Sequence, residues 1–505
     1  MNRTVKLFGP PGTGKTKTLL DIMARELERG VKPHRLAYLT FTVAARREAL
    51  TRAMQQFSLE KEELPYFKTL HSIAYHQLGV TKDMMLTGRS DMQDLADLLG
   101  VRFTPRLLRH DDQMLDFPPG FEEGDRLLQF DHVRRHNQWD VPEALRHADL
   151  DLDVYLVERF TRTYSTWKKD QGYVDFTDLL EADLRPLDID VCIVDEAQDL
   201  SNLQWRAFDI LACNAQRVYI AGDDDQAIFT WAGASPQAFL DYPGEIKVLH
   251  QSYRIPEAVH VVATEISSKI RHRQPKTWQP RPFFGTLRRR AYVDLDLLKD
   301  PGIWLILYRN HYLANELESS LRERGLPYAR HDKPAPGAEW GPAIIYWERL
   351  RRGQAITKWQ AKEVYDALLV GPDVVRGAKS HLESIDRDSV VTYNYLVDRF
   401  GLLVSHQKPW FEALSKIDLG DIQYLRDCIR VGGAEALVGS PKIKLSTIHA
   451  AKGAEADNVM LLTEMSRKSQ QKVDVNPDEE RRVFYVGVTR AKEQLVIVGE
   501  ENPLL

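Results

Sequence analysis

Residues 9–16 have the composition and spacing of a phosphate-binding loop. They follow the pattern Gly-x-x-x-x-Gly-Lys-Thr, in which the glycines let backbone N–H groups close around a phosphate. Lys15 is placed to reach the β- and γ-phosphate oxygens, and Thr16 to ligate Mg²⁺. A Gly-Pro turn before a helix is the alternative, but the segment lies between an expected strand and an expected helix, as the motif requires. We predict a nucleotide site made by Gly9, Pro10, Pro11, Gly12, Thr13, Gly14, Lys15 and Thr16.

Two adjacent carboxylates, Asp195 and Glu196, follow the apolar run at residues 191–194. A strand that ends in two acids supplies one carboxylate for Mg²⁺ and one to polarise a water molecule. We assign Asp195 to the metal and Glu196 to the water. Acids at a helix N-terminus are a common alternative, but the phosphate loop upstream favours nucleotide hydrolysis.

The phosphate loop and the acid pair can lie together only if the strands before them end at the same edge of one sheet. Apolar runs at 5–8, 36–40, 191–194 and 218–221 each end in polar residues, as parallel strands do. The α/β pattern restarts after Pro256, with strand-like runs at 303–308, 443–447, 459–462 and 495–498. Helical-looking stretches at about 76–160 and 355–435 interrupt the two patterns. The sequence therefore predicts two α/β lobes, each with an insertion.

Composition narrows the class of protein. The chain has 505 residues, 43% hydrophobic residues and a formal net charge of −5, which excludes a disordered chain and a globally basic one. Its 3 cysteines lie far apart, so neither a zinc site nor a disulfide framework is expected, and a cytoplasmic location follows. The apolar runs are too short to cross a bilayer, and no signal peptide is expected.

Further motifs make the chain resemble the UvrD/Rep-like branch of superfamily 1 helicases. Residues 222–234, which begin Gly-Asp-Asp-Asp-Gln, are the most specific of them. The other segments that resemble family motifs, all in the family's order, are 40–48, 69–72, 175–180, 251–254, 446–455 and 479–492.

The resemblance implies an α/β fold of two RecA-like P-loop lobes with parallel sheets, each carrying a mainly helical insertion. We expect the first lobe at residues 1–75 and 161–255, with its insertion at 76–160. The second lobe is expected at 256–352 and 439–505, with a small helical insertion at 353–438. ATP would lie between the lobes, and single-stranded DNA would cross their top.

The resemblance also implies roles in hydrolysis. Arg254 and Arg490 would act as arginine fingers that reach the γ-phosphate only when the lobes close. Gln226 would sense the γ-phosphate and relay its state to the DNA-contacting motif. A lone arginine is more often a surface pair, so the family pattern carries this assignment.

The base and the sugar of ATP have candidate partners of their own. By the same resemblance, Tyr253 would stack on adenine, Glu455 would approach the ribose, and Gly453 belongs to the same nucleotide-binding segment. Family members usually carry a glutamine before the P-loop that reads the adenine edge, and none stands before Gly9 here. We therefore expect relaxed choice among nucleoside triphosphates.

Non-specific binding of single-stranded DNA needs aromatic faces for bases and donors for phosphates. Core packing is the alternative for the phenylalanines, and local helix capping is the alternative for the phosphate contacts. Basic runs at 271–273 and 288–290 are either further DNA contacts or solvated surfaces. The candidates are Phe41, Phe229 and Trp231 for stacking, and His71, Thr447 and His449 for phosphates.

The sequence thus predicts an ATP- and Mg²⁺-dependent DNA helicase that moves 3′→5′ on single-stranded DNA and unwinds duplex. Alternatives are a single-strand translocase with little unwinding and a nucleotide-switched DNA clamp. Thr230 and Ala232 stand where arginines are common in the family, so the grip on DNA is expected to be weaker. The expected partners are single-stranded and tailed duplex DNA, with replication or repair proteins as candidates and no membrane.

Overall fold

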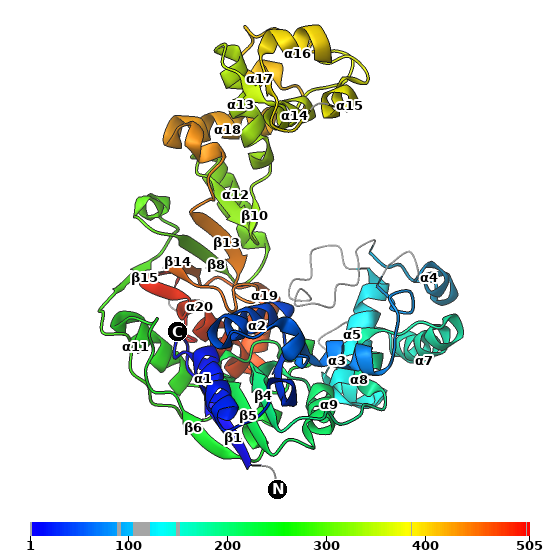
Figure 1. Ribbon diagram of the computed structural model, residues 1–505. Helices are drawn as coiled ribbons and strands as arrows, with labels where there is room; N and C mark the ends of the chain where they lie inside the picture. The colour runs from blue at the N-terminus through cyan, green and yellow to red at the C-terminus, as the bar shows by residue number, and fades with distance from the viewer. Residues whose placement is uncertain (1–2, 88–91, 105–121, 148–151, 385, 501) are drawn as a thin grey trace.

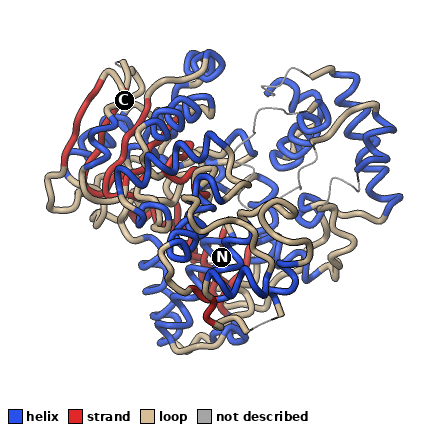
Figure 2. The backbone as a smooth tube through the Cα atoms, turned by 90° about the horizontal axis from the view of Figure 1, so that it is seen from above, coloured by secondary structure: helices blue, strands red, loops and turns tan. Residues whose placement is uncertain are grey.

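The computed structural model describes residues 3–87, 92–104, 122–147, 152–384, 386–500 and 502–505. Two α/β lobes lie against each other, with one helical body beside the first lobe and another carried away from the second lobe on a stalk (Figure 1). The strands fall into two main groups with helices and loops around them (Figure 2). Within the described residues, no helix is both long and apolar enough to cross a membrane.

The first lobe is built on a six-stranded parallel sheet. The predicted strands at 5–8, 36–40, 191–194 and 218–221 are confirmed; β3 and β6 are short or mostly exposed and lack a long apolar run. In sheet order, the strands are β3 (Phe67–Thr69), β2 (Leu36–Thr40), β4 (Val191–Asp195), β5 (Arg217–Gly222), β1 (Arg3–Phe8) and β6 (Glu245–Val248).

Helices cover both faces of this sheet and make two separate hydrophobic clusters. Residues of β2 and β4 are all buried, as expected for central parallel strands. The helices of this lobe are α1 (Lys15–Glu28), α2 (Val43–Phe57), α3 (Leu70–Gln77), α8 (Phe176–Glu181), α9 (Asn202–Ala212) and α10 (Pro236–Asp241).

The first insertion has a hydrophobic cluster of its own. The predicted border between residues 160 and 161 is wrong in detail, because it cuts one continuous helix, α7. Tyr164 and Trp167, which lie beyond that border, are buried in the insertion's cluster. We therefore place the border after Gln171. The helices are α4 (Gln93–Leu99), α5 (Glu123–Asn137), α6 (Val141–His147) and α7 (Val154–Gln171).

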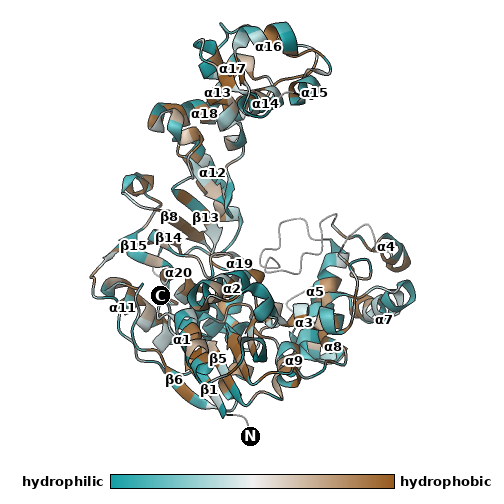
Figure 3. Cartoon of the chain, viewed as in Figure 1, coloured by the Kyte–Doolittle hydropathy of each residue, from teal (hydrophilic) through white to brown (hydrophobic). Residues whose placement is uncertain are grey.

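The second lobe has a seven-stranded sheet that is parallel except for β10. The central strands of both sheets are largely hydrophobic (Figure 3), and all four predicted strands of this lobe are confirmed. In sheet order, the strands are β10 (Lys333–Pro334), β9 (Tyr328–Arg330), β13 (Ile443–Thr447), β8 (Trp304–Tyr308), β14 (Ala456–Leu462), β15 (Ala491–Val498) and β7 (Thr286–Arg290).

Two hydrophobic clusters cover the faces of this second sheet. One joins α11 (Glu257–Ser268) and α20 (Pro477–Val488) to the sheet and also includes Phe229 of the first lobe, so it crosses the lobe junction. The other continues along α12 (Tyr312–Glu323) into the second insertion. The remaining helix of this lobe is α19 (Arg467–Val475).

The second insertion is mainly helical, as predicted, with one small two-stranded sheet. The predicted start at residue 353 leaves α13 in the lobe, yet α13 packs against α14 and α17 of the insertion. We place the start near Gly341 instead. The elements are α13 (Gly341–Arg351), β11 (Ile356–Thr357), α14 (Lys358–Asp366), α15 (Ala378–Glu383), β12 (Val390–Val391), α16 (Tyr393–Phe400), α17 (Trp410–Ala413) and α18 (Leu419–Gly432).

Candidate nucleotide and DNA sites at the lobe junction

The predicted phosphate loop joins the end of β1 to the start of α1. Gly14, at the N-cap of α1, has a left-handed φ of 77°, which favours glycine. The Lys15 side chain folds back across the loop, and its Nζ donates to the Gly9 carbonyl at 3.1 Å. The same Nζ lies 3.9 Å from Glu196 Oε1. The loop therefore presents helix N-terminal amides and a cation to one point, as a phosphate requires.

The predicted metal ligands lie together at the end of β4. Thr16 Oγ1 donates to Asp195 Oδ2 at 3.2 Å, and the Tyr38 hydroxyl donates to the same oxygen at 3.0 Å. Burial raises the pKa of Asp195 to about 6, and the Glu196 charge acts in the same direction. Hard oxygen ligands next to a phosphate loop fit Mg²⁺, which keeps waters and phosphate oxygens in its shell. In the described ranges, no group of three or more His, Cys, Asp or Glu side chains could hold a metal without such help.

Glu196 has an unusual backbone and a defined side-chain partner. Its φ of 54° lies in the left-handed region, which is uncommon for a non-glycine residue. Its Oε2 accepts a hydrogen bond from Gln198 Nε2 at 2.7 Å. Burial would raise the pKa of Glu196, but the charges of Lys15 and Lys452 outweigh it and leave the pKa below its ordinary value. The carboxylate is thus ionised and able to accept a proton from water.

Gln198 is a functional candidate that the sequence analysis missed. Its amide nitrogen holds Glu196, and its Oε1 accepts from the Asp223 backbone N–H at 2.9 Å. It therefore ties the acid pair after β4 to the segment after β5. Its position two residues after Glu196, in the polar run 195–199, was the sequence signal for a role beside the acid pair.

Gln226 and Arg490 meet across the lobe junction. Arg490 Nη2 donates to Gln226 Oε1 at 2.9 Å, and Arg490 Nε donates to the Val486 carbonyl at 2.9 Å. The arginine is 1% exposed. Burial and the neighbouring Arg254 lower the pKa of Arg490 to about 9. The structure thus brings the predicted sensor and one predicted finger into direct contact.

The other predicted finger lies against the phosphate loop. A Cβ added to Gly12 would lie 2.4 Å from Arg254 Cβ, so the two backbones approach closely. Arg254 Nε lies 2.6 Å from Glu455 Oε2, and Lys492 Nζ lies 2.7 Å from Glu455 Oε1. The predicted ribose ligand therefore holds an arginine finger in this structure.

Tyr253 and Gly453 complete the predicted nucleotide set. The Tyr253 backbone N–H donates to the Gly12 carbonyl at 2.8 Å, which fixes the residue beside the loop. Its side chain is 72% exposed, so one ring face is free to take a base. Gly453 has a left-handed φ of 84° in the turn before Glu455. These placements agree with the predicted roles without testing them.

Lys452 is a second residue that the sequence analysis missed. Its Nζ lies 2.6 Å from Asp199 Oδ1 and donates to the Gln226 carbonyl at 2.7 Å. It also lies 4.7 Å from the centre of the Phe229 ring. The lysine therefore joins the second lobe to three places on the first. Its position next to Gly453 was the available signal.

The structure gathers four of the six DNA candidates. Phe41 and Phe229 stack with ring centroids 6.4 Å apart, and His449 lies 6.4 Å from Trp231 and 6.5 Å from Phe229. Phe229 is buried, which favours packing for that ring here, while Phe41 and Trp231 are half-buried. Burial and nearby cations, Arg309 among them, hold the pKa of His449 far below its ordinary value.

The other DNA candidates have structural partners. Thr447 is buried, and its Oγ1 accepts from the Ala450 N–H at 3.1 Å within the turn that follows β13. His71 is half-buried at the start of α3, and its ring meets Phe176 edge-on at 6.0 Å. Neither contact tests the predicted phosphate role.

The two basic runs, 271–273 and 288–290, have structural positions that do not depend on DNA. Arg273 forms a bidentate pair with Asp225, with contacts of 2.7 and 2.6 Å, and its side chain is only 14% exposed. The run at 288–290 forms most of β7, the edge strand of the second sheet. Arg273 of the first run therefore neutralises a buried carboxylate, whereas Arg271 and His272 are exposed. The second run places charge on a sheet edge, which protects that edge.

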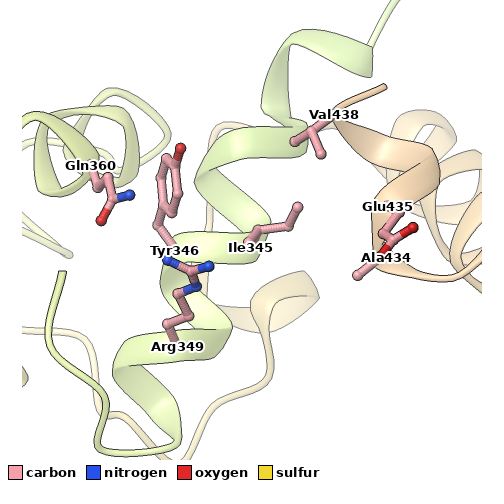
Figure 4. A pocket seen from close by; sticks show the side chains of 7 residues that line it. All are labelled: Ile345, Tyr346, Arg349, Gln360, Ala434, Glu435 and Val438. Atoms are coloured by element: carbon pink, nitrogen blue, oxygen red, sulfur yellow. The ribbon is translucent and has the colours of Figure 1, made fainter. Parts of the chain in front are cut away.

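A separate pocket of about 370 Å³ lies in the second insertion, between α13, α14 and the turn η9 (Ala434–Leu437). Tyr346, Arg349 and Gln360 line one side and Glu435 the other (Figure 4). None of the predicted site residues lines it, so it belongs neither to the nucleotide site nor to the aromatic cluster of Phe41, Phe229, Trp231 and His449.

Comparison with known proteins follows the same division into lobes. Residues 1–247 match the UvrD/REP helicase N-terminal domain, and residues 430–502 match the UvrD-like helicase C-terminal domain. The chain is 21% identical to the ATP-dependent DNA helicase PcrA of Staphylococcus epidermidis, over 98% of this chain and 81% of the relative. It is 23% identical to DNA helicase II of Escherichia coli, over 97% and 81%. The chain belongs to the UvrD/REP helicase family.

Proposed function

We propose that this chain is an ATP-dependent DNA helicase that moves 3′→5′ along single-stranded DNA and unwinds duplex ahead of it. The observation that carries the proposal is the junction of the lobes. There, Gln226 of the first lobe contacts Arg490 of the second at 2.9 Å, beside the phosphate loop and the acid pair. The names of the relatives, an ATP-dependent DNA helicase and a DNA helicase II, support the same activity.

The residues divide the hydrolytic work between the lobes. The loop amides and Lys15 bind the phosphates, and Thr16 and Asp195 would hold Mg²⁺. The bound ion would neutralise phosphate charge and orient the oxygens. Glu196 takes the proton of the attacking water. Arg490 of the second lobe and Arg254, in the connection between the lobes, stabilise the charge of the transition state.

The proposed movement on DNA rests on the connection between the nucleotide site and the aromatic cluster. Gln226 starts a short segment that ends in Phe229 and Trp231, the rings of the aromatic cluster. A change at the γ-phosphate that shifts Gln226 therefore shifts the surface on which bases stack. Lys452 contacts both Gln226 and the Phe229 ring, so the second lobe follows the same shift.

The experiment measures turnover and strand separation together. We expect ATPase activity that needs Mg²⁺ and rises with an oligo-dT strand, and unwinding of a duplex with a 3′ tail but not with a 5′ tail. Stimulated turnover without unwinding would favour the single-strand translocase. ATP-dependent DNA affinity without stimulated turnover would favour the clamp. Unwinding from the 5′ tail would overturn the polarity alone.

Cellular partners follow from the DNA substrate. The proposed DNA partners are single strands and tailed duplexes, met in the cytoplasm. Proteins of replication or repair are the proposed protein partners, because those processes create such DNA ends.

A further inference from the structure

A buried cluster of three consecutive carboxylates lies directly behind the sensor Gln226. Asp223, Asp224 and Asp225 have no exposed surface, and the Lys276 side chain that meets them has none either. Lys276 Nζ lies 3.0 Å from Asp223 Oδ1 and 2.9 Å from Asp225 Oδ2, and it also contacts Asp224. Burial would lower the pKa of Lys276, but the three carboxylates raise it, so the amine is charged.

We infer that Lys276 is a positioning residue that orients the Gln226 amide through Asp223. This inference rests on the sensor role proposed for Gln226. It concerns neither DNA nor nucleotide directly, since the Lys276 amine contacts the three carboxylates and lies 5.8 Å from the centre of the Phe8 ring.

The two carboxylate oxygens of Asp223 have different partners. Oδ1 faces Lys276 at 3.0 Å, and Oδ2 accepts from Gln226 Nε2 at 2.6 Å. Because the nitrogen end of the amide is held there, its oxygen end points to Arg490 Nη2 at 2.9 Å. An amide turned the other way would bring N–H groups against the guanidinium, which has only donors. The lysine thus sets which end of Gln226 faces the finger.

Charge explains why a cation is needed at this place. Three buried carboxylates cannot all stay ionised without compensating charge. Without Lys276, Asp223 Oδ1 would lose the cation that holds it at 3.0 Å, and a displaced Asp223 is a poorer acceptor for Gln226. The lysine therefore acts on the sensor without touching it.

Arg273 supplies a matched control in the same cluster. Its guanidinium pairs with Asp225 at 2.7 and 2.6 Å. Asp225 accepts no hydrogen bond from Gln226 in the described contacts, whereas Asp223 does. Loss of Arg273 removes a buried cation as well, but it leaves the path from Lys276 through Asp223 to Gln226 intact.

The test compares Lys276→Gln, Arg273→Gln, Gln226→Ala and the double variant Lys276→Gln/Gln226→Ala. The readouts are kcat and KM for ATP with saturating oligo-dT, and the melting temperature. We expect Lys276→Gln to lower kcat by about 10- to 100-fold with KM within about threefold. Arg273→Gln should lower the melting temperature similarly but keep kcat within about threefold. The double variant should be no slower than Gln226→Ala alone, because both changes break one path.

Two further variants keep the inference open to disproof if Lys276→Gln does not fold. Lys276→Arg retains the charge and should restore most of kcat, and Asp223→Asn should mimic the loss of Lys276. Full kcat in Lys276→Gln or in a folded Asp223→Asn would overturn the inference, as would multiplied losses in the double variant. Full kcat in Gln226→Ala would instead overturn the sensor role in the proposed function.

Discussion

The two halves of the nucleotide site are assembled to different degrees. In the first lobe, Lys15, Thr16 and Asp195 are fixed by contacts within that lobe, because they follow strands of one parallel sheet. The two predicted finger arginines, Arg490 of the second lobe and Arg254 in the connection between the lobes, are in unlike states. Arg490 is 1% exposed and already bonded to Gln226, whereas the Arg254 side chain is 23% exposed and paired with Glu455.

This difference between the two half-sites indicates which residues must still move when ATP binds. A half-site held by its own lobe is ready for phosphate before ATP arrives. Arg490 needs only small adjustment, since its partner belongs to the first lobe. Arg254 must exchange a carboxylate for a phosphate, and that exchange frees Glu455 for the ribose. The change that ATP causes is therefore expected to be centred on Arg254 and Glu455.

Arg490→Ala is expected to have the largest effect. Its loss removes a finger and a buried bond across the lobes, so kcat should fall by about 10³-fold or more. Turnover with oligo-dT is the measurement, and Arg490→Lys separates charge from geometry, since lysine cannot reproduce the planar fork. Activity near the wild-type level in Arg490→Ala would remove Arg490 from the chemical step, whereas such activity in Arg490→Lys alone would mean that the charge suffices without the planar fork.

Arg254→Ala should follow, with kcat lower by about 10³-fold, the smaller end of the range for finger arginines. Its charge is shared with Glu455 before ATP binds, and its side chain is partly exposed. Binding of ADP, measured by calorimetry, should change little, because the finger acts on the γ-phosphate. A loss of ADP affinity equal to the loss of kcat would mean that Arg254 holds the ground state.

Glu196→Gln tests the first-lobe half of the nucleotide site, which is assembled before ATP binds. The glutamine keeps the shape but cannot accept a proton, so kcat should fall by about 10²-fold or more while ATP still binds. Glu28→Gln, at the exposed end of α1, is the matched control and should be unchanged. If more than about a tenth of turnover remains in Glu196→Gln, the general base lies elsewhere.

Tyr253→Ala should act on binding alone. Stacking on a base contributes about 1–3 kcal/mol, so KM for ATP should rise by about fivefold or more with kcat nearly constant. Tyr253→Phe keeps the ring and should match the wild type. An unchanged KM in the alanine variant would place the adenine elsewhere.

The smallest effect concerns pH. Burial raises the pKa of Asp199 to about 6, although Lys452 acts in the opposite direction. Asp199 is therefore charged and paired with Lys452 above about pH 6 and protonated below it. DNA-stimulated kcat/KM should fall severalfold as the pH drops from 7.5 to 5.5. Asp199→Asn should weaken that fall without abolishing it, because the pKa of Asp195 is also raised to about 6. An undiminished fall in Asp199→Asn would assign it to another group.

Local sequence patterns identify candidates for the first half of the site more directly than for the second half. Residues 9–16 and the acid pair are short-range patterns, and strand ends place them with little help from the rest of the fold. Lys452 and Gln198 were missed, because their partners lie on other strands and other lobes. Periodicity also gave poor borders for the insertions, since α7 and α13 continue across the predicted limits.

Charge runs were the least reliable signal. The run 271–273 has the composition of a solvated or DNA-binding surface, but Arg273 neutralises a buried carboxylate. Nothing local in the sequence pairs residues 273–276 with 223–225; only the folded lobes bring them together. Long-range ion pairs of this kind are beyond any local pattern.

The most direct test is a structure of the protein with ADP, aluminium fluoride, Mg²⁺ and an oligo-dT strand, a mimic of the transition state. Lys15, Thr16 and Asp195 are predicted to keep their present places around the phosphates. Arg254 is predicted to leave Glu455 and contact the fluoride, while Arg490 stays beside Gln226. An Arg254 still paired with Glu455, in a complex with the analogue bound, would contradict the account.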